Sequence, residues 1–113
     1  MAPQLPIRNV GRQGLKASVQ GLGCMGMSMA YKDLSSTVTD EDSIATIHRA
    51  LELGVTFLDT SDVYGPFTHE ELVGKAIKGN REKYMIATKF GNKLQPNGPM
   101  AQPNMCMKPV RHR

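Results

Sequence analysis

Apolar residues recur at helical spacing in the segment that follows Thr39. They are Ile44, Ile47 and Leu51, at positions i, i+3 and i+7, with Ala50 beside them. The hydroxyl of Thr39 can accept the N–H of the third helical residue, and the acids at 40–42 suit the positive end of a helix dipole. Gly54 supplies a left-handed residue after the last turn. The pattern predicts a helix from about Thr39 to the residue before Gly54.

A second segment repeats this design. Thr68 and Glu71 have the S/T-x-x-E spacing of a capping box. An apolar stripe follows them, made of Leu72, Val73, Ala76 and Ile77. Gly79 is the expected stop. The pattern predicts a second amphipathic helix between Thr68 and Gly79.

Short apolar runs stand before, between and after these helices. Residues 8–10 and 15–19 predict a hairpin that leads into the stretch GLGCMG. Residues 55–58 and the stretch YMIATKFG at 84–91 are the nearly continuous apolar runs of strands buried on both faces. The order strand–helix–strand–helix–strand predicts an α/β fold with parallel strands and right-handed crossovers.

This alternation ends near Gly91. Four of the seven prolines follow it, and no apolar period continues there. Each proline disfavours helix at the residue before it, so residues 93–113 are predicted to be irregular. The same segment holds four of the fourteen Lys and Arg residues and no acid, whereas residues 1–92 hold ten of each sign. The net charge of +4 therefore belongs to this tail, and nucleic-acid binding by a folded basic face is not expected.

Composition narrows the class of protein. A chain of 113 residues with 40% hydrophobic and 21% charged residues fits one soluble globular domain. No run approaches the roughly 18 apolar residues of a membrane span, and the N-terminus lacks the apolar core of a secretory signal. The two cysteines, Cys24 and Cys106, are too few for a disulfide framework and indicate reduced thiols in the cytoplasm.

No metal site is expected from the sequence. His48 and His69 have no partner at metal-ligand spacing, so solvated or capping roles are favoured over zinc. The run Met105-Cys106-Met107 has no further ligand nearby, and chance composition accounts for it better than a soft-metal site.

The stretch GLGCMG has the G-x-G-x-x-G spacing of a dinucleotide-binding loop, and Glu41 follows Gly21 by 20 residues. That loop requires a buried strand before it and a helix directly after it. Here the preceding LKASVQ is polar, and about 12 residues separate the glycines from the next N-cap. We therefore interpret the glycines as the end of the first strand, where small residues let a flat cofactor ring approach.

Polar groups are expected where the strands end. Asp59 and Tyr64 follow the second strand, Lys89 ends the third, and Gly23-Cys24-Met25 end the first. A tyrosine has a pKa of about 10, and a neighbouring cation lowers that pKa, so Lys89 beside Tyr64 would make an acid able to protonate a carbonyl oxygen. Asp59 would hold the ammonium group. Taken singly, a turn aspartate, a packing tyrosine and a snorkelling lysine remain the alternatives.

The blocks VGRQGLKASVQGLGCMGMS, GVTFLDTSDVYGPFTHEELVGKAIKG and IATKFG closely resemble the N-terminal part of aldo-keto reductases, in particular the plant perakine reductase-like and auxin-induced-protein-like branch. The resemblance implies part of a (β/α)₈ barrel, NADP(H) as the cofactor, and aldehydes or ketones as substrates. It also implies that Asp59, Tyr64 and Lys89 belong to a catalytic tetrad with Tyr64 as proton donor, and that residues 23–25 and Asp59 lie near the nicotinamide.

The resemblance covers roughly residues 5–100 and stops short of a full barrel, which needs about 250 residues. The fourth member of the family's tetrad is a histidine after a fourth strand, and His112 in the closing RHR has no strand context. We expect residues 1–92 to be the N-terminal portion of the reductase domain and 93–113 a divergent tail. We therefore expect this chain to have weak or no reductase activity, because most of the family's cofactor site is absent from it. The alternative function is a non-catalytic form that associates with full-length relatives.

Overall fold

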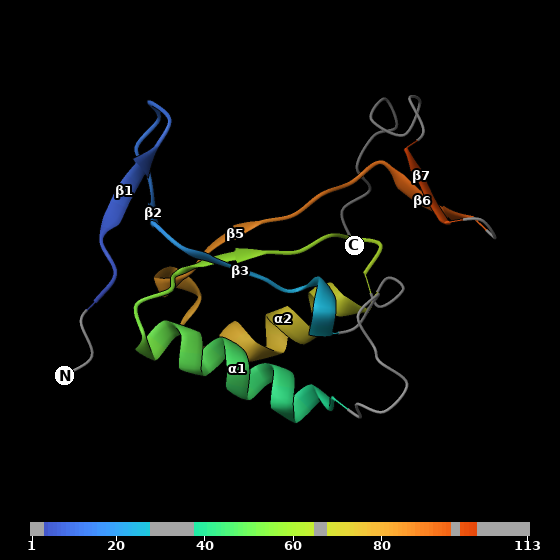
Figure 1. The fold of residues 1–113 in the computed structure, drawn as a ribbon, viewed down its shortest axis with the longest axis horizontal. Coiled ribbons are helices and arrows are strands. Elements are labelled where there is room, and N and C mark those ends of the chain that lie inside the picture. The colour runs from blue at the N-terminus through green and yellow to red at the C-terminus, as the bar shows by residue number, and fades with distance from the viewer. Residues whose placement is uncertain (1–3, 28–37, 65–67, 96–97, 102–113) are drawn as a thin grey trace.

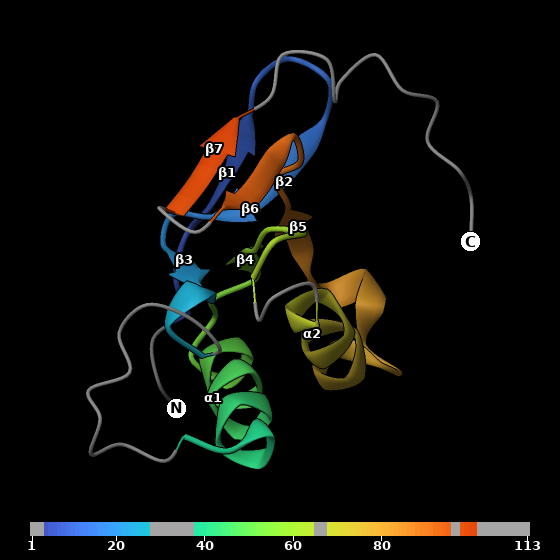
Figure 2. The same ribbon diagram turned by 90° about the vertical axis from the view of Figure 1, so that its right-hand side faces the viewer.

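The computed structural model describes residues 4–27, 38–64, 68–95 and 98–101. A central β–α–β–α–β unit forms a parallel sheet in the order β3-β4-β5, and both helices lie on the same side of it (Figures 1 and 2). The elements of this unit are β3 (Gly21–Gly23), α1 (Asp40–Glu52), β4 (Phe57–Asp59), α2 (His69–Ile77) and β5 (Met85–Ala87). The sequence prediction of a parallel α/β unit with three strands and two helices is confirmed.

Helix α1 begins at the predicted cap. Thr39 is extended (φ −89°, ψ 166°), and its Oγ1 accepts a hydrogen bond from the backbone N–H of Asp42 at 3.1 Å. The carboxylate of Asp42 accepts in return from the backbone N–H of Thr39, also at 3.1 Å. After the last turn, Gly54 has φ +90°, and a Cβ at this position would lie 2.8 Å from the backbone N of Leu5. Only glycine meets both conditions without strain.

Helix α2 begins differently from the prediction. The Thr68 side chain makes no cap hydrogen bond, so the predicted capping box with Glu71 is wrong. The physical reason is that Thr68 has helical angles (φ −111°, ψ −13°) in place of the extended conformation that brings an N-cap side chain to the third amide. The carbonyl of Tyr64 instead accepts from the amides of Thr68 and His69, at 3.2 and 3.1 Å.

The core lies between the sheet and the two helices. Its buried members are Cys24, Ile47, Leu58, Val73, Ala76, Ile77 and Tyr84. The predicted apolar stripe of α2 is buried throughout, while α1 buries Ile47 and leaves its neighbours on the stripe half-buried. Nε2 of His48 lies 2.6 Å from the carbonyl oxygen of Ala76, which ties α1 to the end of α2. The core therefore fixes the position of both helices relative to the sheet.

Two antiparallel hairpins stand at opposite ends of the molecule in Figure 1. The first, β1 (Ile7–Val10) with β2 (Leu15–Ser18), is the predicted one. It is fastened to the start of β4 by reciprocal bonds in which Ser18 and Thr56 each donate a backbone N–H to the other's hydroxyl, at 3.1 and 2.9 Å. Among the described helices, none is long and apolar enough to span a membrane.

The second hairpin, β6 (Asn92–Gln95) with β7 (Gly98–Ala101), corrects the sequence prediction. Irregular structure was expected from residue 93 onward, yet these two strands pair, with Leu94 opposite Pro99. A two-stranded ribbon has open edges, so a proline that cannot donate an N–H is tolerated within it. Residues 96–97 and 102–113, which include Cys106 and His112, lie outside the described residues.

Candidate active site

The parallel register brings the ends of the three strands together. Gly23 pairs with Asp59, and Asp59 pairs with Ala87 on the other side. Backbone hydrogen bonds continue past the last pairs: the N–H of Thr60 donates to Ala87 at 2.8 Å, and that of Asp62 donates to Lys89 at 3.1 Å. The segments after β4 and β5 therefore leave the sheet side by side, at its carboxyl edge.

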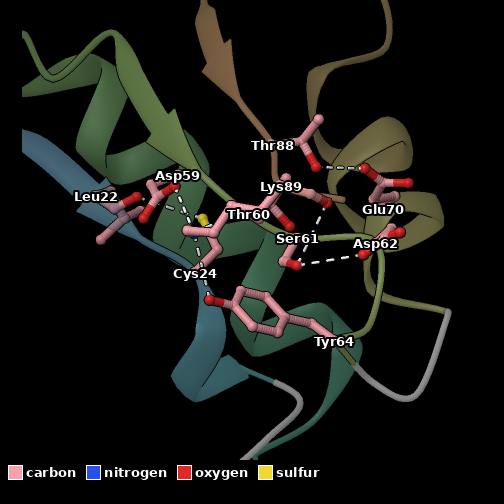
Figure 3. A network of polar contacts seen from close by, with 10 residues as sticks. All are labelled: Leu22, Cys24, Asp59, Thr60, Ser61, Asp62, Tyr64, Glu70, Thr88 and Lys89. Carbon is pink, nitrogen blue, oxygen red and sulfur yellow. Dashed lines mark hydrogen bonds and ion pairs between the residues drawn. The ribbon is translucent and has the colours of Figure 1, made fainter. Parts of the chain in front are cut away.

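Lys89 contacts the other two side chains that the sequence indicated, Asp59 and Tyr64 (Figure 3). Its Nζ donates to Oδ1 of Asp59 at 2.8 Å and to the hydroxyl oxygen of Tyr64 at 3.4 Å. The same nitrogen donates to the carbonyl oxygen of Thr60 at 3.1 Å and lies 5.3 Å from the centre of the Tyr64 ring. Asp59, Tyr64 and Lys89 therefore lie together at one edge of the sheet, as the sequence predicted.

The charge of Lys89 is stabilised by these contacts. The hydrogen bond to Asp59 is the main cause that raises the pKa of Lys89 above its ordinary value, desolvation opposes it, and the hydrogen bond to Tyr64 adds to the increase. The side chains of Lys89 and Asp59 are 45% and 47% exposed, so water screens the pair and their site is open to small molecules. The ammonium group is therefore charged at neutral pH. Besides Asp59 and Thr60, it contacts the hydroxyl oxygen of Tyr64.

Tyr64 stands on the segment between β4 and α2. Its N–H donates to the carbonyl of Ser61 at 3.3 Å, and its own carbonyl accepts from the first residues of α2. The ring of His69 meets the ring of Tyr64 edge to face, with centroids 5.8 Å apart and an angle of 73° between planes. The backbone on both sides of Tyr64 and its ring are thus held by neighbouring residues.

His69 and Thr60 are the site neighbours that the sequence analysis missed. His69 was expected to be solvated or to cap the helix, but its side chain is fully buried. A signal was present, because His69 lies three and four residues before Leu72 and Val73 and therefore on their apolar face. The contribution of Thr60 comes from its backbone carbonyl, which no side-chain pattern reveals.

The residues at the end of β3 differ sharply in exposure. A Cβ built on Gly23 would meet no atom within 4 Å, so the space beside its partner Asp59 is open. The Cys24 side chain is completely buried, and its thiol donates to the carbonyl of Leu22 at 3.5 Å. Burial, with the nearby charge of Asp59, raises the pKa of Cys24 to about 11. The backbone of Cys24 is also occupied, because its N–H donates to the carbonyl of Asp59 at 2.9 Å and its carbonyl accepts from the N–H of Met27 at 3.1 Å. The buried, protonated thiol is therefore no nucleophile.

The glycines of GLGCMG have a structural explanation. A Cβ on Gly21 would lie 2.9 Å from the ring of Phe57, the residue that pairs with it on β4. After the strand comes a 3₁₀ turn of three residues, Met25–Met27. In the described segment up to Met27, no α-helix begins at these glycines, whereas a dinucleotide-binding loop opens directly into a helix.

Further polar contacts join the segments that follow β4 and β5 to each other and to α2. Thr88 donates its hydroxyl to Oε1 of Glu70 at 2.6 Å, which links the end of β5 to the first turn of α2. Ser61, fully buried, lies with its hydroxyl 3.4 Å from Oδ1 of Asp62 and 3.5 Å from the carbonyl of Lys89. In the part of the chain that the structure describes, no group of three or more His, Cys, Asp or Glu residues is arranged to hold a metal ion.

Comparison with known proteins gives one consistent result. Residues 21–112 match the profile of the aldo/keto reductase family. The fold is similar to an aldo-keto reductase from Bacillus halodurans in its holo form, with 31% sequence identity and a TM-score of 0.72, covering 88% of this chain and 31% of that one. It is also similar to a Pseudomonas aeruginosa protein assigned to the aldo-keto reductases, with 26% identity and a TM-score of 0.71, covering 85% of this chain and 35% of the other. This chain spans about a third of the length of either structure.

Proposed function

The chain belongs to the aldo/keto reductase family of oxidoreductases, and from this premise we propose that it takes part in the NADPH-dependent reduction of aldehydes and ketones, with Tyr64 as the proton donor. The observation that carries the proposal is the position of Lys89, whose ammonium contacts the Asp59 carboxylate and the Tyr64 hydroxyl together. A phenol beside a cation can donate the proton that carbonyl reduction needs, and active sites of this kind of parallel β/α arrangement lie at the carboxyl edge of the sheet.

The direction of the hydrogen bonds supports the role of Tyr64. Lys89 donates to the phenol oxygen, so the proton of the phenol stays available for the oxygen of a substrate carbonyl. When that proton is transferred, Lys89 stabilises the phenolate that remains, and Asp59 keeps Lys89 charged and in place. The carbonyl carbon would accept the hydride that a reduced nicotinamide, when bound, would supply. The products are then the alcohol, the oxidised nicotinamide and the Tyr64 phenolate, and a proton taken up from solvent regenerates the phenol.

The residues present fit the nicotinamide end of such a cofactor. The open space at Gly23, next to Asp59, admits a flat ring, and Met25 is half-buried close to it in sequence. We assign Gly23, Met25 and Asp59 to this contact, whereas Cys24, which the sequence analysis placed with them, has no exposed surface. The same proposal includes NADPH, as opposed to NADH, as the cofactor and membership of the plant perakine reductase-like branch. It also includes a cytoplasmic location, which would keep the free Cys24 thiol reduced.

The test is oxidation of NADPH with an aromatic aldehyde, followed by absorbance, for three forms of the chain. Tyr64→Phe is expected to lower turnover by about 100- to 10,000-fold, because proton transfer is lost while the ring remains. Tyr84→Phe is the matched control, since the Tyr84 hydroxyl is buried in the core and makes no hydrogen bond within the described residues. Turnover that survives Tyr64→Phe would overturn the proposal, as would equal losses in both variants.

A second candidate function is association with a longer aldo/keto reductase. Within the described residues, β3 and β5 each pair on one side only, and an unpaired strand edge can accept another strand. Size-exclusion chromatography of the chain with a full-length reductase tests this idea. Co-elution in a 1:1 complex, without NADPH turnover by the chain alone, favours association; independent elution of the two proteins excludes it.

A further inference from the structure

We propose that His69 is a positioning residue for Tyr64: its buried ring holds the phenol ring in the orientation that lets the hydroxyl meet Lys89. The inference rests on the proposed role of Tyr64 as proton donor. It adds a residue that lies outside the Asp59, Tyr64 and Lys89 cluster and touches Tyr64 alone among these three in the contacts described above.

Two contacts join His69 to Tyr64. The backbone N–H of His69 donates to the Tyr64 carbonyl at 3.1 Å, and the two rings pack edge to face at a centroid distance of 5.8 Å and an angle of 73°. This is one of the arrangements that aromatic rings favour, because the positive edge of one ring meets the negative face of the other. His69 therefore restrains both the main chain and the side chain of Tyr64.

The His69 ring is held rigidly by its surroundings, whereas the Tyr64 ring needs a further contact to fix its orientation. His69 is the first residue of α2 and fully buried, so the helix and the core fix its ring. Tyr64 stands outside the regular elements, and its ring is only half-buried. Its contact with Lys89 is long, at 3.4 Å, and comes from a lysine with a flexible stem. That contact alone does not define the direction of the phenol.

The charge state of His69 is consistent with this role. Burial lowers its pKa, and the neighbouring carboxylate of Glu70 counteracts this only as the smaller cause. The imidazole is therefore neutral at pH 7, and it meets Tyr64 as an aromatic ring. Lys89 remains the cation that contacts the phenol.

The first test is a proton NMR measurement on the unaltered chain. Nuclear Overhauser contacts are expected between the ring protons of His69 and Tyr64, and between the Tyr64 ring and the ε-protons of Lys89. Their absence in a folded sample overturns the proposal without any variant. The measurement needs neither cofactor nor turnover, so it stands even where the proposed reductase function fails.

Two variants then separate positioning from space filling. His69→Leu fills the site without a ring, and His69→Phe restores a ring edge. We expect His69→Leu to lose the contact between Tyr64 and Lys89 while the methyl signals of Ile47 and Leu58 report an intact core, and His69→Phe to keep that contact. Where NADPH turnover is measurable, His69→Leu should lower kcat by about three- to tenfold with KM unchanged, and His69→Phe should recover most of it. Retention of the contact and of kcat in His69→Leu contradicts the proposal, and so does its loss in both variants.

Discussion

The Nζ atom of Lys89 lies 2.8 Å from Oδ1 of Asp59, although 30 residues separate them in the chain. Asp59 is the last residue of β4, and Lys89 stands two residues beyond the end of β5. The two meet because these strands are parallel neighbours and their following segments continue side by side. This pair holds the ammonium group that reaches Tyr64 and favours its charged form.

Replacing Asp59 by Asn should lower the pKa of Lys89, because the hydrogen bond to Asp59 is the largest cause of its increase. Carbon-detected NMR titration of the Lys89 ε-carbon measures this pKa directly. In the unaltered chain the pair contributes fully to stability below the ordinary lysine value of 10.5, and the contribution is lost as pH rises through the raised pKa. Asp62→Asn is the control, since the Asp62 carboxylate contacts Ser61. An equal shift in both variants contradicts the assignment.

Thr39→Ala should destabilise the fold by about 1 kcal/mol, because it removes the acceptor of the first-turn amide of α1. Urea denaturation followed by circular dichroism measures the change. The hydrogen bonds with Thr39 lower the pKa of Asp42, so the reciprocal cap is complete above pH 3.8 and is lost as pH falls through the lowered value. Thr46→Ala, on the exposed side of the same helix, should stay within about 0.5 kcal/mol. Similar losses in the two variants would refute the cap.

Gly54→Ala should cost about 2–3 kcal/mol, since a non-glycine residue is strained at φ +90° and its Cβ would press on the backbone of Leu5. Gly14→Ala is matched in backbone angle, with φ +84°, but its Cβ would meet no atom within 4 Å. We therefore expect Gly14→Ala to be milder by about 1 kcal/mol or more in the same denaturation assay. If both variants lose the same free energy of unfolding, the backbone around Leu5 moves aside to accommodate the Cβ at position 54, and the predicted clash is wrong.

Cys24 should make the fold sensitive to alkaline pH. Its pKa is about 11 in the folded chain against 9.0 for the ordinary thiol, so the unfolded state releases the proton first and stability falls as pH rises above 9. The loss should reach about 1 kcal/mol at pH 10 relative to pH 8. Cys24→Ala has no thiol at this position and supplies the reference curve. Parallel stability curves for the two proteins between pH 8 and 10 would rule out a buried, protonated thiol.

Local signals were enough to predict the secondary structure of the central unit. Apolar spacing located both helices, Thr39 marked the start of α1, and Gly54 and Gly79 adopt the positive φ values expected of helix stops. Asp59 and Lys89 were found because polar residues that follow buried strands lie at the carboxyl edge of a parallel sheet. The cap at Thr68 failed, since the chain around Tyr64 gives that residue a helical backbone.

By itself, the sequence determined the helices and strands of the central unit, the first hairpin, and which residue types arrive at the strand ends, because periodicity, caps and glycines act over a few residues. The pairing of β6 with β7 was not among these predictions. Only the tertiary structure decided the register that sets Gly23, Asp59 and Ala87 in one row. It also decided that Lys89 reaches Tyr64, and that Cys24 and His69 are buried. Those outcomes depend on packing between residues far apart in the chain, which no local pattern encodes.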